Sequence, residues 1–202
     1  MDGVIFNSVG FSRGVFLKRH PGVTEAMYNE IHIGNYHEGA SKYHHLEIKQ
    51  TEAEKNQHRL NYAEGKSKVP VFPGMDILLS DLHKLGYLIV LNTNAYNRTC
   101  LPLLERSKMR VFFDFLTTAD TSTDKVEKFK LIEDKYKADK KDILFITDAL
   151  GDLRDADIAK IPTLVVTWGV HDKNYFTREK HDNLIGIFDK VEELSAFLKN
   201  FS

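Results

Sequence analysis

The stretch DILFITDALGDLRDADIAKIPTLVVTWG (residues 142–169) decides the fold of this chain. It begins with the short apolar run DILFIT, continues with GDLRDADIAK, which favours a helix, and ends with a second apolar run, PTLVVT. A strand, a helix and a strand in this order form a right-handed crossover unit in which the two strands run parallel. The stretch therefore predicts an α/β protein with a buried parallel sheet.

The same alternation continues over the C-terminal two-thirds of the chain. We expect short strands at residues 87–93, 111–118, 142–147, 162–167 and 183–188. Helices are expected at residues 74–86, 98–108, 125–137, 151–160 and 191–200, with Pro102 confined to the first turn of its helix.

Residues 11–66 read differently, because helix formers dominate and strand-like runs are few. Thr24 and Ser41 are candidate caps for helices that follow them. Pro70 and Pro73 mark the change from this helical part to the alternating part. We therefore predict an α/β core made of residues 1–8 and 68–202, with residues 9–67 inserted as a helical cap.

Composition narrows the classes of function. The chain has 202 residues, 42% hydrophobic and 28% charged, with a formal net charge of −1, which argues against a nucleic-acid partner bound by broad electrostatic attraction. Cys100 is the single cysteine, and no apolar run of about 18 residues is present to span a membrane. We expect a cytoplasmic protein with no membrane partner, and the sequence leaves its oligomeric state open.

Polar residues collect where the carboxyl ends of parallel strands are expected. They are Asp2 at the start of the chain, Thr93-Asn94 after one apolar run, Lys125 at the start of a helix, and the pair Asp148 and Asp152 after another run. In an open parallel sheet these ends meet at one edge, where ligands bind. Paired carboxylates suit Mg²⁺, and a lysine with a hydroxyl residue suits a phosphoryl group. This pattern indicates phosphoryl transfer.

The order Asp-Gly-Val, helical insert, Thr-Asn, Lys and Asp-x-x-x-Asp resembles the haloacid dehalogenase superfamily. The stretch of residues 142–169 is the most specific part of the likeness, Thr93-Asn94 is less specific, and a lone lysine is weak. Within the superfamily the chain resembles the phosphatases with a helical cap, such as phosphoglycolate phosphatase and β-phosphoglucomutase relatives. The resemblance implies a Rossmann-like sheet and a Mg²⁺-dependent hydrolase that acts on a small phosphorylated metabolite, a phosphomonoester, through an aspartyl-phosphate.

The resemblance also implies a role for each polar residue. Asp2 would be the general acid and base and would offer its backbone carbonyl to the metal, while Thr93 and Asn94 would bind the phosphate. Lys125 would hold the phosphate, although Lys128 is a rival for this role. The metal ligands would be completed by Asp148 and Asp152.

One position of the family pattern is absent from the sequence. The nucleophile is the first aspartate of Asp-x-Asp, and here Met1 fills the middle position, so that the nucleophile and the central strand leading to it would precede Met1. Either the recorded chain starts at an internal methionine, which we favour, or it is a short inactive form. In the second case it is a module that binds a phosphorylated ligand or a protein partner. Dehalogenation is the weaker enzymatic alternative, because it does not need the acid that Asp2 would supply.

Two further expectations concern residues outside this pattern. His32, His37, His44 and His45 fall in one helical region without a metal-binding spacing, so we expect them on solvated helix faces. Lys160 stands where a helix of the family often ends at a glycine in a left-handed turn.

Overall fold

The computed structural model describes residues 1–201 and confirms the α/β class. Every predicted strand forms, each over a shorter range than its apolar run. The strands are β1 (Val90–Asn92), β2 (Phe115–Thr117), β3 (Phe145–Thr147), β4 (Thr163–Val166) and β5 (Leu184–Phe188). All pairings between them are parallel, as the alternation of strands and helices requires.

The strands form two sheets, one of β1 and β2 and one in the order β3-β4-β5. Every residue of β4 is buried, which explains its continuous apolar sequence. Within residues 1–201, β1 and β3 do not pair with each other. The predicted loss of a central strand before Met1 stays a prediction.

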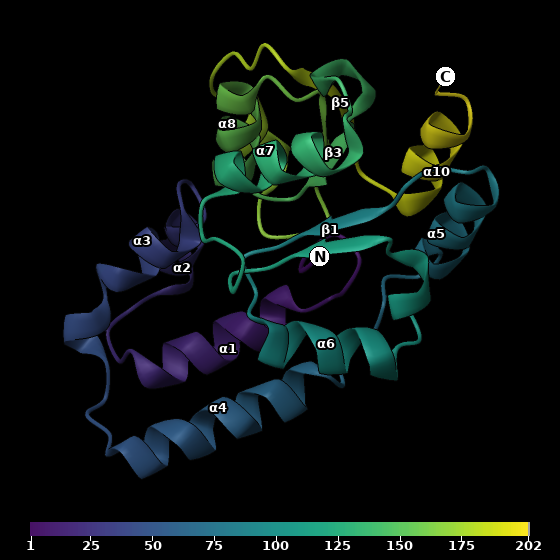
Figure 1. Cartoon of the computed structure of the whole chain (residues 1–202). Helices are drawn as coiled ribbons and strands as arrows, with labels where there is room; N and C mark the ends of the chain where they lie inside the picture. Colours follow the sequence, from purple (N-terminus) through teal and green to yellow (C-terminus); the bar gives the residue numbers. More distant parts are fainter. Residues whose placement is uncertain (202) are drawn as a thin grey trace.

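Helices flank the strands above, beside and below the two sheets (Figure 1). In the core they are α5 (Met75–Lys84), α6 (Asn97–Arg106), α7 (Lys125–Tyr136), α8 (Leu150–Ala159), α9 (Lys173–Thr177) and α10 (Val191–Lys199). The 3₁₀ helix η2 (Arg110–Phe112) follows α6 and η3 (Lys140–Asp142) follows α7, whereas η1 (His44–Leu46) lies within residues 9–67. Lys160 ends α8 with a φ of +61°, so a lysine occupies the expected left-handed turn.

One detail of helix α6 differs from the prediction. The helix begins at Asn97, so Pro102 lies in its second turn rather than its first. The proline removes a single backbone donor, and Cys100, Leu103 and Leu104 bury the apolar face of the helix against the core. Packing of that face therefore outweighs the local cost of the proline.

Residues 9–67, here called the cap segment, form helices joined by turns and contain no strand. The segment holds α1 (Val9–Arg19), α2 (Glu25–Ile31), α3 (Tyr36–Ser41) and α4 (Glu52–Lys66). In Figure 1, α1 and α4 lie below the strands, and α2 and α3 lie to their left. Thr24 caps α2, as predicted, because its side chain accepts a hydrogen bond from the Met27 amide at 3.2 Å. Ser41 caps nothing that follows it; it ends α3, whose N-terminus Asn35 caps instead.

The division into core and cap segment stays a prediction, and Ser202, which ends the predicted core, lies outside the described residues. Among residues 1–201, no helix combines the length and apolar character that a membrane crossing requires.

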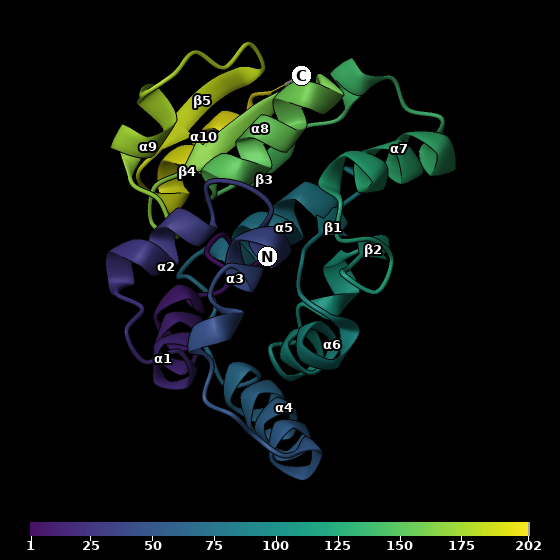
Figure 2. The same ribbon diagram turned by 90° about the vertical axis from the view of Figure 1, so that its left-hand side faces the viewer.

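The N-terminal residues are part of the main hydrophobic core. Met1, Val4, Ile5 and Phe6 are buried together with residues of α5, α6, α10, β1 and β4. The indole Nε1 of Trp168 donates a hydrogen bond to the Val4 carbonyl at 3.1 Å. Both views place the N-terminus in the middle of the molecule (Figures 1 and 2). This packing places the half-buried Asp2 between the cap segment and the strands.

Candidate functional site

All of the predicted site residues line one cavity of about 660 Å³ between the strand ends and the cap segment. The residues come from separate parts of the chain and include Asp2, Thr93, Asn94, Lys125, Asp148 and Asp152. Thr93 and Asn94 follow β1, Asp148 follows β3, and Lys125 begins α7. The carboxyl ends of parallel strands lie at the same edge, so these residues come together there. The predicted convergence is therefore present, and the roles assigned to these residues stay predictions.

Asp148 is held in a close-fitting backbone cradle. Its Oδ2 accepts a hydrogen bond from the Val170 amide at 2.8 Å. A Cβ atom at either Gly3 or Gly169 would overlap the carboxylate, and Gly3 also has a φ of +66°. Burial raises the pKa of Asp148 to about 7. The carboxylate thus sits where a positive charge would be strongly favoured.

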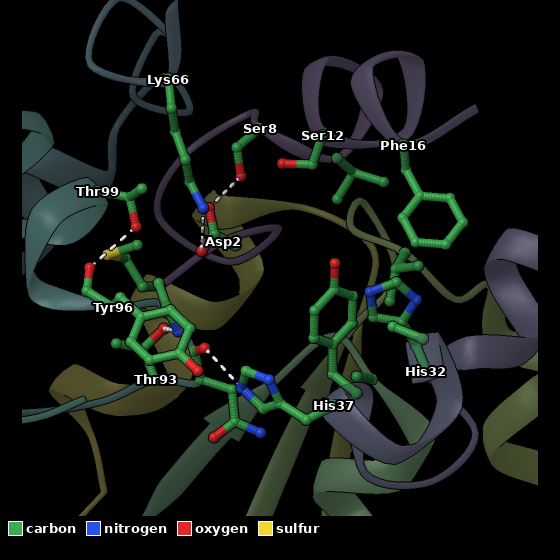
Figure 3. Close-up of a pocket in the computed structure, with 18 of the residues that line it drawn as sticks. Asp2, Ser8, Ser12, Phe16, His32, His37, Lys66, Thr93, Tyr96 and Thr99 are labelled. Carbon is green, nitrogen blue, oxygen red and sulfur yellow. Dashed lines mark hydrogen bonds and ion pairs between the residues drawn. The ribbon is translucent and has the colours of Figure 1, made fainter. Parts of the chain in front are cut away.

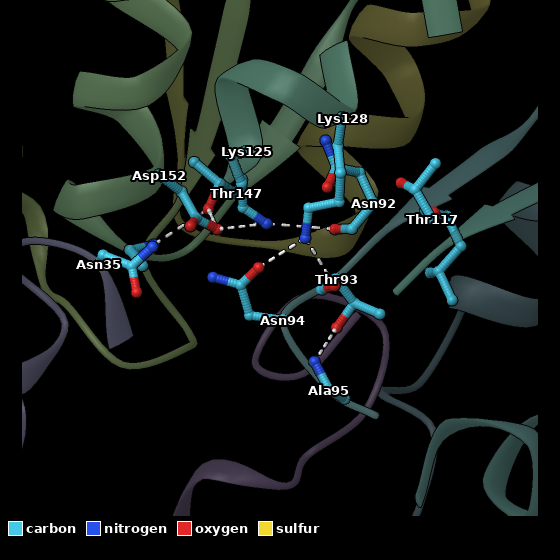
Figure 4. A network of polar contacts seen from close by, with 12 residues as sticks. Asn35, Asn92, Thr93, Asn94, Ala95, Thr117, Lys125, Lys128, Thr147 and Asp152 are labelled. Carbon is cyan, nitrogen blue, oxygen red and sulfur yellow. Dashed lines mark hydrogen bonds and ion pairs between the residues drawn. The ribbon is translucent and has the colours of Figure 1, made fainter. Parts of the chain in front are cut away.

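Asp152 and Lys125 form an ion pair beside this cradle (Figure 4). Lys125 Nζ lies 3.2 Å from Asp152 Oδ2 and donates to the Asn92 carbonyl at 3.3 Å. Thr147 Oγ1 donates to the same Asp152 oxygen at 2.9 Å. These contacts fix the Lys125 ammonium at the cavity wall, where it can meet an anion.

Lys128, the rival lysine, has different contacts. It is fully buried, and its Nζ lies 2.9 Å from the Thr93 carbonyl and 2.5 Å from Asn94 Oδ1. Burial, with the charge of Lys125 nearby, lowers the pKa of Lys128 to about 7. The side chain therefore supports the loop after β1, whereas Lys125 faces the cavity.

The loop after β1 offers polar groups to the cavity. The Thr93 amide continues the sheet by donating to the Thr117 carbonyl at 2.9 Å, and Thr93 Oγ1 accepts from the Ala95 amide at 3.2 Å. The buried side chain of Asn92, to which the sequence pattern assigned no role, also lines the cavity, and within residues 1–201 neither of its amide atoms has a hydrogen-bond partner. Such a buried amide is usually satisfied by water or ligand.

Asp2 is held by two partners, one of which the sequence did not reveal (Figure 3). Ser8 Oγ donates to it at 2.5 Å, and Lys66 Nζ, from the last residue of α4, lies 3.0 Å away. Burial alone would raise the pKa of Asp2, but the charge of Lys66 and these hydrogen bonds outweigh it, so the pKa is lowered. Asp2 is consequently a carboxylate at neutral pH, and Lys66 ties the cap segment to it.

The expectation of solvated histidines is wrong for two of the four. The rings of His32 and His37 are half-buried and line the cavity, and His37 Nε2 lies 3.3 Å from the Asn94 carbonyl. Ring packing around the cavity explains their burial, while His44 and His45 are exposed as expected. Within residues 1–201 no group of three or more His, Cys, Asp or Glu side chains is arranged to hold a metal ion.

A seam of hydrogen bonds joins the end of α2 to the start of α8. The Gly151 amide donates to the His32 carbonyl at 2.9 Å, and Arg154 donates to the Ile33 carbonyl at 3.0 Å. His171 accepts from the Leu150 amide through Nδ1 at 2.9 Å, so its Nε2–H is free to donate to the Asn29 carbonyl at 3.1 Å. Burial lowers the pKa of His171 to about 4, so the ring is neutral.

Comparisons with known proteins agree with this geometry. Residues 1–166 match the family described as haloacid dehalogenase-like hydrolase. None of the curated proteins matches the chain. Among solved structures, a hydrolase from Pseudomonas syringae is similar with a TM-score of 0.81 and 17% identity, covering 100% of this chain and 96% of that chain.

Two further structures are also similar. A predicted phosphatase from Clostridium acetobutylicum gives a TM-score of 0.77 at 19% identity, with 100% of this chain and 96% of that chain covered. A predicted phosphoglycolate phosphatase from Haemophilus somnus 129PT gives 0.76 at 22% identity, with 100% and 95% covered. At identities this low, the similarity to these solved structures shows that the fold is shared and nothing about function. The family match extends over more than half of the chain, which therefore belongs to the haloacid dehalogenase-like hydrolases.

Proposed function

We propose that this chain is built for the Mg²⁺-dependent hydrolysis of a small phosphomonoester. The observation that carries the proposal is the shared cavity, in which Asp2, Thr93, Lys125, Asp148 and Asp152 meet. Hydrolysis breaks the P–O bond to the alcohol, joins phosphorus to a water oxygen, and delivers a proton to the departing alkoxide. Each of these changes requires a group of the kind that lines the cavity.

The residues present fit a divalent cation of the magnesium type. Asp148 is a buried carboxylate with a raised pKa that lines the cavity, and the absence of a Cβ at Gly3 and Gly169 makes room for it. Mg²⁺ is commonly held by one or two carboxylates and several waters, so a cluster of three acidic side chains is not needed. Asp148, Asp152 and the Asp2 carbonyl would hold the ion, which would neutralise phosphate charge as it shifts.

The chain's own residues have separate tasks in this proposal. Lys125 and the Thr93 hydroxyl hold the phosphate oxygens, and Asn94 completes the loop that receives them. Asp2 gives a proton to the leaving oxygen and later, as the carboxylate that Lys66 stabilises, accepts a proton from the attacking water. The aspartyl-phosphate route also needs a nucleophilic carboxylate directly before Met1, a position outside the given sequence.

The test compares two forms of the chain. Phosphate release from a panel of phosphomonoesters is measured with Mg²⁺, on the chain as given and on a form extended by an apolar strand ending in aspartate directly before Met1. Phosphate binding is measured on both forms by calorimetry. The proposal expects turnover that is abolished by Asp148→Asn, with the extended form the more active by several orders of magnitude.

The outcomes separate the proposal from its alternative. Phosphate binding without turnover in either form would favour a phosphate-binding module. Turnover that survives Asp148→Asn would place the chemistry elsewhere. If neither form binds phosphate or releases it, both functions are excluded.

A further inference from the structure

Six aromatic rings form a continuous wall on one side of the cavity. Five of them come from the cap segment and one from the loop before α6, and we call them the aromatic wall: Phe16, Tyr28, His32, Tyr36, His37 and Tyr96. Successive ring centroids lie between 5.0 and 5.6 Å apart, which is the range of favourable ring contacts. Figure 3 shows the labelled members as an arc that runs from Phe16 to Tyr96. Apart from Tyr28, each ring is only half-buried, so part of its surface is left for a ligand.

The aromatic wall begins beside the phosphate end of the cavity. His37 Nε2 lies 3.3 Å from the carbonyl of Asn94, the residue that follows Thr93. Tyr96 is two residues further along the same loop, and its ring contacts that of His37. A phosphate held by Thr93 and Lys125 would therefore direct its ester substituent along the rings.

The wall carries no charge at neutral pH. Burial raises the pKa of Tyr28 well above its usual value and that of Tyr36 to about 12, so both phenols stay protonated. Burial also lowers the pKa values of His32 and His37, which keeps the imidazoles neutral. These four rings thus offer neutral surface, and the charge beside the wall is the guanidinium of Arg98, 4.4 Å from the ring centroid of Tyr96.

Two of the three lysine and arginine side chains of the cap segment that line the cavity are held in ion pairs. Lys66 binds Asp2 at 3.0 Å, and Arg19 forms an ion pair with Glu47. The third, Arg59, donates to Asn56 Oδ1 at 2.7 Å. The cavity of about 660 Å³ is also large for a two-carbon ester, and its size is that of a site for a ring-bearing ligand.

We infer that the substrates are phosphomonoesters of alcohols that carry a planar aromatic or heteroaromatic ring, with the ring seated against the aromatic wall. The inference rests on the proposed function and names its substrate class. Stacked or edge-to-face contacts with the wall would add binding energy that an aliphatic group of the same size cannot obtain. A mononucleotide is one ligand of this kind and of suitable size.

The test uses phosphonates, which cannot be hydrolysed at the P–C bond. Binding of benzylphosphonate, cyclohexylmethylphosphonate and inorganic phosphate to the chain is measured by calorimetry with Mg²⁺. Benzylphosphonate is expected to bind about tenfold more tightly than its saturated counterpart, because the two differ mainly in aromatic character. Equal affinities, or tighter binding of the saturated compound, would overturn the inference.

The three probes also separate this inference from the proposed function. Phosphate that binds, with no preference for the aromatic phosphonate, refutes the inference alone. If phosphate and both phosphonates fail to bind, the proposed function falls with it. This comparison needs no variant and so does not depend on how a mutated cap segment folds.

A set of tyrosine variants locates the effect. Tyr36→Ala should weaken benzylphosphonate binding about fivefold, and Tyr36→Phe, which keeps the ring, should restore it. Tyr43→Ala is the matched control, because Tyr43 belongs to the cap segment but does not line the cavity. An equal loss in the Tyr43 and Tyr36 variants would show a general effect on the fold and contradict the assigned location.

Discussion

The two sides of the cavity are constructed from different interactions. On the core side, charged groups are fixed by ion pairs and by backbone hydrogen bonds, as between Lys125 and Asp152 and around Asp148. On the cap side, neutral rings contact one another over 5.0 to 5.6 Å. In the proposed function, fixed charges would hold the phosphoryl group that all substrates share, whereas ring surface would distinguish one alcohol from another. The comparison suggests that reaction and selectivity can be altered separately.

Glycine substitutions on the two sides should give the largest contrast. Gly3→Ala places a Cβ against the Asp148 carboxylate and forces an alanine to a φ of +66°, so we expect a loss of about 3 kcal/mol or more in the free energy of unfolding. Gly10→Ala is the matched control, because Gly10 lies in α1 with open space around it. It should leave stability unchanged or raise it by about 0.5–1 kcal/mol. Chemical denaturation of both variants measures the difference, and a similar response at the two positions would deny that the core side is the more rigid.

Protonation of His171 should weaken the seam where the two sides meet. Its pKa is lowered to about 4, so between pH 4 and its ordinary value the folded chain binds fewer protons than the unfolded chain. The contribution of neutral His171 to the free energy of unfolding is complete above a pH of about 6.5. As the pH falls toward 4, up to about 3 kcal/mol of it is lost.

Denaturation curves at several pH values test this effect in the parent chain and in His171→Asn, which cannot titrate. The variant should depend less steeply on pH in this window. It should keep some dependence, since the pKa values of His20, His32 and His37 are lowered by burial as well. Parallel curves for the two proteins would mean that His171 does not carry the effect.

The two lysines of α7 sharpen the comparison within the core side. Lys125→Met should weaken the binding of inorganic phosphate, measured by calorimetry with Mg²⁺, by about tenfold or more, because it removes the ammonium at the cavity wall. Lys128→Met should change this affinity by less than about twofold, because Lys128 contacts Thr93 and Asn94 from behind the loop. The opposite ranking would assign the phosphate-binding role to Lys128.

The smallest expected effect concerns the cap segment alone. Thr51 and Glu54 form a capping box at the start of α4, with Thr51 Oγ1 accepting from the Glu54 amide at 3.3 Å. Thr51→Ala should cost about 1 kcal/mol of stability and leave phosphate affinity unchanged. The melting temperature and the phosphate affinity of this variant are both measured. Loss of phosphate binding would show that the two sides of the cavity are more tightly coupled than their contacts indicate.

The sequence predicted the core side better than the cap side for a physical reason. Buried strands need apolar runs, and the ends of parallel strands must meet, so the positions of Thr93, Lys125 and Asp148 follow from local pattern and chain order. The separation of the strands into two sheets could not be predicted, because a pairing between distant segments leaves no mark in either one. The placement of Pro102 was misjudged because tertiary packing outweighed a local rule.

The cap side carried a weaker signal. Tyr28, His32 and Tyr36 are spaced four residues apart, which allows neighbouring rings to contact one another on a helical surface. The same spacing also fits rings on a solvated helix face. Which of the two arrangements forms depends on the tertiary packing, which the spacing does not specify. The ion pair between Lys66 and Asp2 could not be predicted from the sequence, because the two residues lie 64 positions apart.

The hydrogen bond from the Gly151 amide to the His32 carbonyl makes that amide a reporter of movement between α2 and α8. Any swing of α2 away from α8 must break this bond and admit solvent deuterium to that single N–H. The rate of hydrogen–deuterium exchange at the Gly151 amide would therefore report how often the cavity opens. A bound ligand that holds α2 against α8 would slow this exchange.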